Sequence, residues 1–383
     1  MNILYICPEF LPSIGGIVTH VYNIAYRMKR HYGYKVVIYA LDRARTSASL
    51  TEFIDGLEVR RFCSFAPNRC YYFSPEMLLF LRREAKTGSY DLVHVHSYTN
   101  FGPLAVYILT KLDLTKAKTV FTPHFHPQST SQAREMLRKM YDLFLRKQIF
   151  SAFDTLVTLT GAEKNILSSF CNEQKISIIP NGINLEEFDH ISESLFKDAH
   201  MPRNSPYILY VGYLLKYKGL DTMLFAFSKV LKELESDVKL VFVGDGTYRD
   251  RLQNMTNRLG LKRHVIFTGF IERKLLISAI KGCSIFVMPS SYEAFSISTV
   301  EAMACRKPVI VTRTGGLCEL GIDDEFMVRY GDVHALSERI KYLLENNTIA
   351  ESVGWKNYLV ARRYSWDSVA KSHHELYKNI LNS

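Results

Sequence analysis

Residues 283–316, with the sequence CSIFVMPSSYEAFSISTVEAMACRKPVIVTRTGG, decide the fold of this chain. The apolar runs at 283–290 and 307–316 predict two buried strands, and the stretch between them predicts a helix that begins around Ser296 to Ser298. Strand, helix and strand in this order are typical of an α/β fold with a parallel sheet.

The same alternation of strand and helix runs through the whole chain in two series. The first series predicts strands at 3–7, 35–40, 57–62, 91–97, 118–124, 154–160 and 175–181, and the second at 207–212, 238–246, 264–270, 283–290 and 307–316. Two series predict two doubly wound, Rossmann-like parallel-sheet domains, residues 1–190 and 191–360. The boundary near residue 190 is placed there because the stretch 183–206 is polar and weakly patterned.

The position of the site follows from this architecture. In open α/β sheets, ligands bind outside the carboxyl ends of the strands. We therefore expect the two sheets to face each other across a central cleft that holds the site, with its residues in the loops that follow the strands.

The composition is that of a globular protein. The chain has 383 residues, of which 47% are hydrophobic and 22% charged, which excludes disordered and fibrous classes. Its apolar runs are far shorter than the ~20 residues that cross a bilayer. The first residues, MNILYICPEF, predict a strand and not a secretion signal, and the seven Cys residues form no C-x-x-C pair. We expect a cytoplasmic protein without disulfides.

Positive charge is concentrated in the first half of the chain. Residues 1–180 carry 22 Lys and Arg against 14 Asp and Glu, whereas residues 181–383 carry 26 against 24. A lopsided field of this kind attracts anionic partners. The basic segment 133–150 predicts an amphipathic helix, which either packs its apolar stripe on the protein's own core or lies on an anionic membrane. No base-stacking or groove-reading motif accompanies the charge, so we expect no nucleic acid partner.

Two histidine pairs stand at the ends of neighbouring predicted strands: His94 with His96, and His124 with His126. Residues i and i+2 of a strand share a face, so either pair offers two imidazoles to a metal ion. No Cys or carboxylate accompanies them at a recurrent ligand spacing, and we predict no metal site. We expect instead that the ring of His124 faces a substrate.

Glycines and carboxylates mark two further loops. Gly15 and Gly16 precede a helix whose N-terminal amides favour a phosphate, although a turn of this kind also uses glycine for steric reasons alone. Glu293 stands before the helix of the opening stretch and Glu301 lies within it, with the free amides from Phe295 to Ser298 between them. Carboxylates accept hydrogen bonds from sugar hydroxyls, and helix amides donate to a diphosphate.

Taken in order, the motifs resemble those of the family 4 retaining glycosyltransferases, which have the two-domain GT-B fold. The motifs are the Gly15–Gly16 pair, FTPH (121–124), IIPNGIN (178–184), VGYLLKYKG (211–219), VGDG (243–246), TGF (268–270), EAFSISTVEAMA (293–304) and TGG (314–316). The resemblance covers nearly the whole chain. It implies that residues 361–383 form a last helix that returns to the first domain.

The resemblance also implies roles for these residues. The first domain would bind the acceptor and the second the nucleotide sugar, with no metal ion or other cofactor. The expected catalytic residues are His124 at the sugar hydroxyls, Lys218 at the diphosphate and Glu293 at the donor sugar. The other expected donor-binding residues are Gly15, Gly16, Gly212, Tyr213, Lys216, Phe270, Ile271, Phe295, Ser296, Ile297, Ser298 and Glu301.

Two positions depart from the family pattern. The family usually has Arg after the glycine of VGY, where this chain has Tyr213, so that one guanidinium is missing from the diphosphate site. Lys216 is the candidate to replace it as a point charge. Ser296 stands where the family often has Gly, so the backbone there must accommodate a Cβ.

The implied activity is transfer of a hexosyl unit from a UDP- or GDP-linked sugar to a hydroxyl group, with retained configuration. The basic first half suggests a glycan or lipid-linked acceptor that is anionic or membrane-anchored, and peripheral contact with the cytoplasmic face of a membrane. Two alternatives stay open: a nucleotide-sugar epimerase of the same fold, and a nucleotide-sugar-binding homologue with weak or no catalysis.

Overall fold

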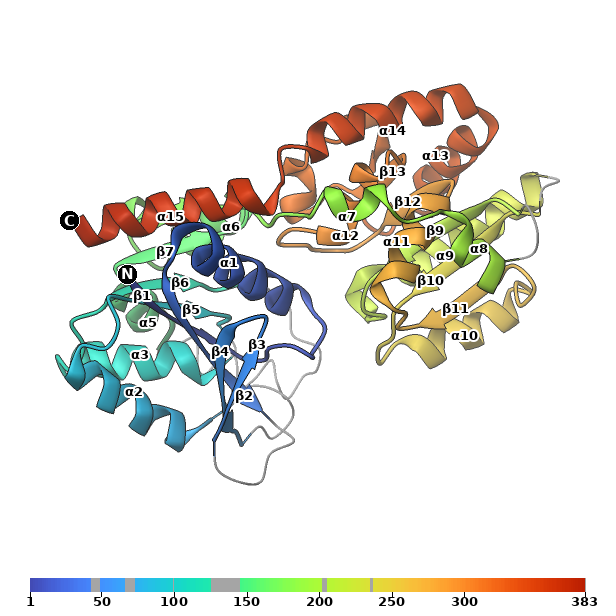
Figure 1. The fold of residues 1–383 in the computed structure, drawn as a ribbon. Helices are drawn as coiled ribbons and strands as arrows, with labels where there is room; N and C mark the ends of the chain where they lie inside the picture. The colour runs from blue at the N-terminus through green and yellow to red at the C-terminus, as the bar shows by residue number, and fades with distance from the viewer. Residues whose placement is uncertain are drawn as a thin grey trace. The chain divides into compact units, whose positions relative to one another are not determined.

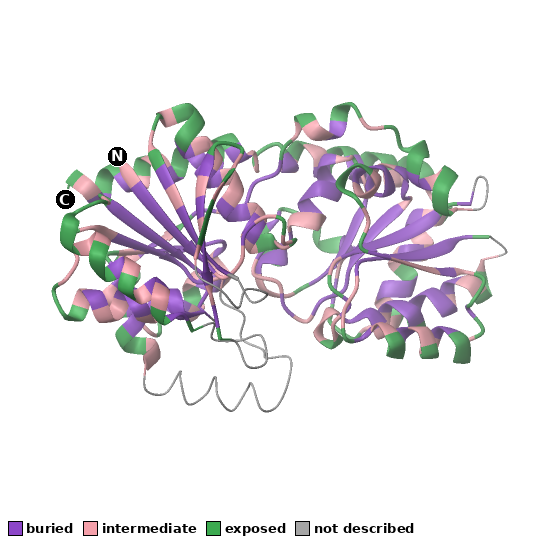
Figure 2. Cartoon of the chain, turned by 60° about the horizontal axis from the view of Figure 1, so that its bottom comes forward, coloured by how far each residue is buried: buried purple, intermediate pink, exposed green. Residues whose placement is uncertain are grey.

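The computed structural model describes residues 1–42, 49–65, 73–98, 100–124, 145–201, 205–234 and 237–382. The chain forms two compact units: unit 1 comprises Met1–Gly182 and Trp366–Ser383, and unit 2 comprises Ile183–Ser365 (Figure 1). Each unit is a sheet with helices on both faces, and buried residues are concentrated in the strands (Figure 2). The two doubly wound α/β sheets expected from the sequence are confirmed.

Unit 1 contains an eight-stranded sheet in the order β3-β4-β2-β1-β5-β6-β7-β8. Its strands are β1 (Asn2–Cys7), β2 (Lys35–Asp42), β3 (Leu50–Ile54), β4 (Leu57–Cys63), β5 (Leu92–His96), β6 (Lys118–Thr122), β7 (Thr155–Thr158) and β8 (Ile176–Ile178). The central strands are apolar along nearly their whole length, because helices cover both faces of a parallel sheet. All seven strands predicted for this half are present.

Strand β3 was not predicted, and it is the antiparallel member of the sheet. It forms a hairpin with β4 through Asp55 and Gly56, whose φ angles of 49° and 77° are both left-handed. An Asp-Gly pair in this conformation is the preferred turn of a two-residue hairpin. The five residues of β3 are exposed or half-buried at the sheet edge, so they carry none of the apolar signal that predicted the other strands.

The helices of unit 1 form two hydrophobic cores, one on each face of the sheet. The helices are α1 (Gly16–Tyr32), α2 (Pro75–Thr87), α3 (Phe101–Lys111), α5 (Lys147–Ala152), α6 (Gly161–Leu167) and α15 (Trp366–Asn382), with a 3-10 turn at Glu173–Lys175. One core contains buried residues of α1 and α15, and the other contains buried residues of α2, α3, α5 and α6. The C-terminal helix α15 therefore completes the core of unit 1.

Unit 2 contains a six-stranded, fully parallel sheet in the order β11-β10-β9-β12-β13-β14. Its strands are β9 (Tyr207–Val211), β10 (Lys239–Val243), β11 (Val265–Gly269), β12 (Ile285–Met288), β13 (Val309–Thr312) and β14 (Met327–Val328). The five predicted strands are present. The sixth, β14, has only two residues and is too short to give a pattern.

The helices of unit 2 connect these strands. They are α7 (Glu186–Asp189), α8 (Ser194–His200), α9 (Leu220–Glu233), α10 (Arg249–Arg258), α11 (Arg273–Gly282), α12 (Ile297–Ala304), α13 (Val333–Glu345) and α14 (Asn347–Ala361), with 3-10 turns at Lys216–Lys218, Gly315–Glu319 and Asp324–Phe326. The opening stretch of the sequence forms β12, α12 and β13, as predicted.

The chain passes between the units at Gly182–Ile183 and again at Ser365–Trp366. The polar stretch 183–206 predicted the first junction near residue 190. The difference arises because the polar stretch after Ile183 is not a linker: Phe188 of α7 and Phe196 of α8 are buried in unit 2, and the amide of Phe196 donates to Ser278 Oγ over 2.9 Å.

Within the described residues, no helix combines the length and apolar character needed to span a bilayer. The basic segment 133–150 lies largely outside the described residues. Only its end is described, where Ile149 and Phe150 of α5 are buried in a core of unit 1.

Candidate functional site

The strand orders define one ligand-binding edge in each unit. In unit 1, β2 lies on one side of β1 and β5 on the other, so the strand order changes direction at β1. In unit 2, β10 and β11 lie on one side of β9 and β12 lies on the other, so the strand order changes direction at β9. Ligands of open α/β sheets bind at the carboxyl ends of the strands beside such switch points. All the candidate site residues of the sequence lie near one of these two edges.

The edge of unit 2 brings Lys218 and Glu293 together. The Nζ atom of Lys218 lies 2.5 Å from Oε1 of Glu293, and Ser290 Oγ donates to the same oxygen over 2.7 Å. The side chains of Lys218 and Glu293 are only 12% and 14% exposed. Burial acts most strongly against the charge of Lys218, but interactions with Glu293 and Tyr217 outweigh it and raise the pKa of Lys218. Lys218 is thus a fixed, charged ammonium group.

Gly219 makes this approach possible. It ends the 3-10 turn Lys216–Lys218 with a left-handed φ of 66°, and a Cβ on it would lie 2.1 Å from the carbonyl oxygen of Pro289. The amide of Ser291 donates to the carbonyl of Tyr217 over 2.8 Å. The loop after β9 and the loop after β12 are therefore packed backbone against backbone, and any side chain at residue 219 would separate them.

Helix α12 begins beside this ion pair. Ser296 is its N-cap residue, and among the described residues no side chain caps the amides of the first turn; the hydroxyl of Ser296 accepts from Thr299 Oγ1 over 2.8 Å. The φ of Ser296 is −122°, an extended conformation that any residue adopts, so a Cβ there causes no strain. The N-terminal amides, including those of Ile297 and Ser298, offer an anion site with a favourable helix dipole. Phe295 is buried.

The first turn of α12 is also tied to the switch point. Ser298 Oγ donates to the carbonyl of Val211, the last residue of β9, over 3.2 Å. The amide of Gly316, in the TGG motif, donates to the carbonyl of Glu293 over 2.8 Å. These bonds hold together the loops that follow β9, β12 and β13. Each of the separate sequence motifs therefore contributes to one group of loops at the carboxyl ends of the strands. Gly212 directly follows β9 in this cluster.

Glu301 is buried in α12 and has partners that the sequence did not reveal. Its Oε1 lies 2.7 Å from Nη1 of Arg273, and Arg273 donates two further bonds of 2.9 Å to Glu187. Burial raises the pKa of Glu301, and Arg273 acts in the opposite direction. The Glu187–Arg273–Glu301 chain links three helices far apart in sequence, and no local pattern predicts it.

Tyr213 and Phe270 form an exposed aromatic pair at the same edge. Their rings meet edge to face, with centroids 5.8 Å apart, and the two residues are 46% and 56% exposed. The carbonyl of Tyr213 accepts from Tyr210 Oη over 3.0 Å, which holds the backbone in place. Ile271 follows Phe270 and is half-buried, and Lys216 is exposed on the adjoining turn.

The edge of unit 1 presents Gly15 and Gly16 at the N-terminus of α1. Gly15 is the N-cap residue, no side chain caps the helix, and the first turn contains no acidic residue. The helix has 17 residues, so its N-terminal amides carry the full effect of the helix dipole. The geometry is compatible with the phosphate contact expected from the sequence.

A cluster of five histidines lies at this edge, and we call His20, His94, His96, His124 and His373 the histidine cluster. The rings of His94 and His96 have centroids 4.1 Å apart, and His20 lies 5.3 Å from His96 and 5.0 Å from His124. The strand-end members were predicted from the sequence, but His20 of α1 and His373 of α15 were not, because helices bring these two in from distant parts of the chain. His126 lies outside the described residues.

The members of the histidine cluster differ in their hydrogen bonds. Both nitrogens of His94 are satisfied, by Tyr377 Oη and by Thr122 Oγ1 at 2.7 Å each. His124 follows β6 with a left-handed φ of 46° and is half-buried, and its Nε2 faces Nδ1 of His96 at 3.4 Å. Burial is the main cause that lowers the pKa of all five rings, and it lowers that of His20 to about 4. The rings are therefore neutral at pH 7.

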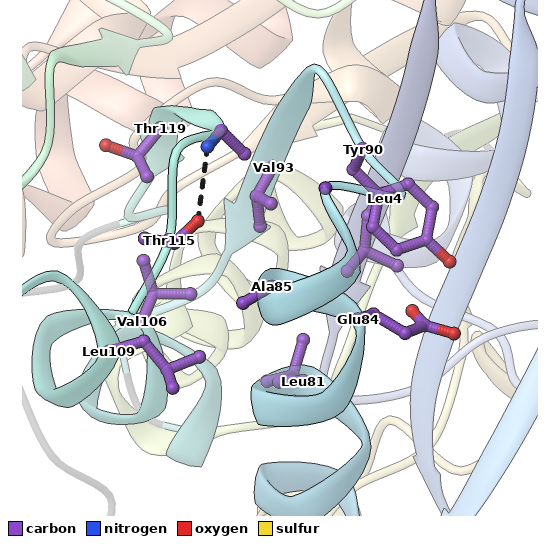
Figure 3. A pocket seen from close by; sticks show the side chains of 12 residues that line it. Leu4, Leu81, Glu84, Ala85, Tyr90, Val93, Val106, Leu109, Thr115 and Thr119 are labelled. Atoms are coloured by element: carbon purple, nitrogen blue, oxygen red, sulfur yellow. Dashed lines mark hydrogen bonds between the residues drawn. The ribbon is translucent and has the colours of Figure 1, made fainter. Parts of the chain in front are cut away.

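An apolar pocket of unit 1 lies away from the ligand-binding edge of that unit. Figure 3 shows it lined by Leu81 and Ala85 of α2, Leu109 of α3, and Thr115 and Thr119 near the start of β6. It therefore opens near the amino ends of the strands, and none of the candidate site residues lines it.

Two families match the chain in succession. Residues 14–187 match the family described as Glycosyltransferase Family 4, and residues 192–359 match that described as Glycosyl transferases group 1. An uncharacterised glycosyltransferase of Methanocaldococcus jannaschii is 26% identical over 97% of each chain. A phosphatidyl-myo-inositol mannosyltransferase of Mycobacterium leprae is 25% identical over 100% of this chain and 98% of its own.

Solved structures share the two-domain architecture. Sucrose-phosphate synthase of Thermosynechococcus elongatus superposes with a TM-score of 0.80 over 100% of both chains, at 21% identity. HepE of Anabaena, in complex with UDP-glucose, superposes with a TM-score of 0.78 over 99% of this chain and 100% of its own, at 17% identity.

Proposed function

The chain belongs to the family 4 glycosyltransferases with the GT-B fold, and from that premise we propose that it transfers a hexosyl unit from a nucleotide diphosphate sugar to a hydroxyl group, with retained anomeric configuration. One observation carries the proposal: the charged, immobilised Lys218 stands beside an uncapped helix N-terminus at the switch point of unit 2. An ammonium group and free helix amides together suit a diphosphate.

The donor residues follow from this arrangement. The diphosphate binds Lys218 and the amides that begin α12. Binding draws Lys218 away from full pairing with Glu293, whose carboxylate then accepts hydrogen bonds from hydroxyls of the donor sugar. Glu301, oriented by Arg273, accepts from the ribose, and backbone groups near Phe270 and Ile271 contact the base. His124 contacts hydroxyls of the transferred sugar.

The reaction proceeds on one face of the sugar. The bond between the anomeric carbon and the phosphate oxygen breaks, and Lys218 and the helix amides stabilise the negative charge that develops on the diphosphate. The acceptor oxygen attacks the same face, and its proton passes to the departing phosphate oxygen. No protein nucleophile is evident in the motifs, so the route has no covalent intermediate. No metal ion takes part in this scheme.

The donor and acceptor classes are supported by relatives. HepE was solved with UDP-glucose, which favours a UDP-linked sugar as the first donor to test, with GDP-linked sugars beside it. The mannosyltransferase of M. leprae is named for phosphatidyl-myo-inositol, and unit 1 contains most of the basic excess. We therefore expect an anionic or lipid-linked acceptor.

The experiment that tests this function combines a panel of UDP- and GDP-sugars with phosphatidylinositol, inositol phosphate and polyprenyl-diphosphate sugars, in the presence of a chelator. We expect release of nucleoside diphosphate that depends on both substrates, and a product with the anomeric configuration of the donor. A product of inverted configuration would contradict the mechanism. An isomerised nucleotide sugar formed without acceptor would identify an epimerase, and tight donor binding without any turnover would identify a binding protein.

Replacing Tyr213 with Arg should increase activity. The substitution supplies the guanidinium that the family usually has at this position, and one charge-assisted contact to a diphosphate contributes about 1.5 to 3 kcal/mol, or roughly a factor of 10 to 150 in kcat/KM. Steady-state kinetics with the identified donor measures the change. Tyr213→Gln is the matched control, because it removes the ring without adding charge, and it should give no gain. An unchanged or lower kcat/KM for Tyr213→Arg would show that residue 213 does not contact the diphosphate.

A further inference from the structure

Three imidazoles of the histidine cluster converge in unit 1 from separate elements. His20 belongs to α1, His96 ends β5, and His124 follows β6. Each offers one ring nitrogen such that the three atoms lie within 4.8 Å of one another. Nδ1 of His96 and Nε2 of His124 are 3.4 Å apart. Zinc–nitrogen bonds of about 2.0 to 2.1 Å give a tetrahedral edge of about 3.3 Å, so this pair already has the required spacing.

A hydrogen bond fixes the orientation of His20. Its Nδ1 lies 2.5 Å from Oδ1 of Asn181, and an amide oxygen only accepts, so Nδ1 carries the proton. The lone pair is therefore on Nε2, which is buried and has no hydrogen-bond partner among the described residues. An imidazole that donates one N–H to an oxygen and points the other nitrogen inward is the usual arrangement of a metal-binding histidine.

Unsatisfied nitrogens are concentrated at this point. Besides Nε2 of His20, the described structure leaves Nε2 of His96 and both ring nitrogens of His373 without a partner. Of these nitrogens, Nε2 of His20 is the one that faces the ligand atoms described above, since His96 offers Nδ1, and a buried polar atom without a partner calls for a ligand. His94, in the same cluster, has partners on both nitrogens and needs none.

We infer that His20, His96 and His124 bind one divalent transition-metal ion of the zinc type, with water in the fourth position. Imidazole binds a metal ion in its neutral form. His20 and His96 are buried, whereas His124 is half-buried. The sequence predicted no metal site because no Cys or carboxylate accompanies the strand-end histidines at a recurrent ligand spacing, and the third imidazole proposed here, His20, lies on a helix distant in sequence.

The site has a consequence that rests on the proposed function. His124 is assigned to hydroxyls of the transferred sugar, and a histidine that holds a metal ion through Nε2 is not free to make that contact. Metal binding and sugar binding therefore exclude each other, so that the ion inhibits transfer instead of assisting it.

The test is a titration of the chelator-treated full chain with Co²⁺ and then with Zn²⁺. We expect one equivalent of Co²⁺ to give the visible absorption of tetrahedral coordination, and Zn²⁺ to displace it. His20→Asn keeps a side-chain N–H for Asn181 but removes the ligand nitrogen, and should weaken binding at least about 100-fold. Asn181→Ala removes only the orienting bond and should weaken it about 10- to 100-fold. His334→Asn, at an exposed histidine of unit 2, should bind as the parent does.

Absence of stoichiometric binding, or equal binding by parent and His20→Asn, would overturn the site and leave a buried water as the ligand of these nitrogens. Thermal unfolding with chelator shows whether each variant is folded. If His20→Asn is not, His124→Asn, at the half-buried ligand, replaces it. A third result is possible: the parent binds the ion and His20→Asn does not, but the bound ion does not inhibit transfer by the parent. This result would keep the metal site and refute the contact of His124 with the sugar, so the two proposals fail separately.

Discussion

Lys218→Met is expected to lower kcat by about 10²- to 10³-fold, or roughly 3 to 4 kcal/mol, the usual loss when one group that stabilises a developing anion is removed. Methionine keeps the length and apolar stem of lysine but supplies no charge. Steady-state turnover of the identified donor and acceptor measures the effect.

The loss must be separated from damage to the fold. Lys218→Met leaves the carboxylate of Glu293 buried without its cation, which costs stability by itself. The double variant Lys218→Met/Glu293→Gln removes both charges, so we expect it to regain stability while turnover stays low. Lys239→Met is the matched control, because Lys239 is a buried lysine paired with Asp237 at the opposite, amino end of the same sheet. Equal losses of turnover in Lys239→Met and Lys218→Met would refute the special role of Lys218.

Unit 1 is expected to lose much of its stability between pH 7.5 and 5.5 when metal is removed by a chelator. Burial lowers the pKa of His20 to about 4, against about 6.5 in an unfolded chain. Between these values the unfolded chain binds a proton that the folded chain does not, so stability is complete above pH 6.5 and falls as the pH falls toward 4. Between pH 7.5 and 5.5, His20 alone accounts for about 1.4 kcal/mol of the loss.

The other members of the histidine cluster add to this loss with the same sign, because burial lowers the pKa of each. The neighbouring Tyr5 and Tyr377 do not oppose it, because burial raises their pKa values and keeps them neutral. Urea unfolding at the two pH values measures the change. In unit 2 the described histidines are exposed or half-buried: His190, His200, His264 and His334. The stability of unit 2 should therefore change less than that of unit 1 between the two pH values.

His373→Phe sharpens this test. Neither ring nitrogen of His373 has a partner among the described residues, so an apolar ring of similar shape should not destabilise unit 1 at pH 7.5. It should also lower by up to one the number of protons taken up on unfolding at acidic pH, so that the stability of unit 1 falls less steeply with pH. A pH dependence as steep as that of the parent would show that His373 is not the buried, neutral ring described above.

Most of the fold could be predicted from the sequence because its strands are buried on both faces. Runs such as Tyr207–Val211 and Lys239–Val243 are almost continuously apolar, and they were located to within a few residues. The hairpin strand β3 was missed because an exposed edge strand carries no such run, although Asp55–Gly56 was a usable turn signal. Phe188 and Phe196 were read as part of a linker because each is a single buried aromatic residue in a polar stretch.

The candidate site was predictable where its residues stand in local motifs. The Lys218 turn, the Glu293 loop and the start of α12 each directly follow a strand, so the sheet order alone brings them to one edge. Arg273 and His20 could not be predicted in this way. Each acts through a partner on another element, and a contact between distant elements leaves no spacing in the sequence.

The central claim is that Lys218 and the amides of α12 hold a diphosphate, and calorimetric binding of a nucleoside diphosphate and the matching nucleoside tests it most directly. The account predicts that Lys218→Met weakens binding of the diphosphate about 30- to 100-fold, corresponding to about 2 to 3 kcal/mol for a lost charged contact, and leaves binding of the nucleoside within about twofold. Equal affinity of parent and variant for the diphosphate would contradict it.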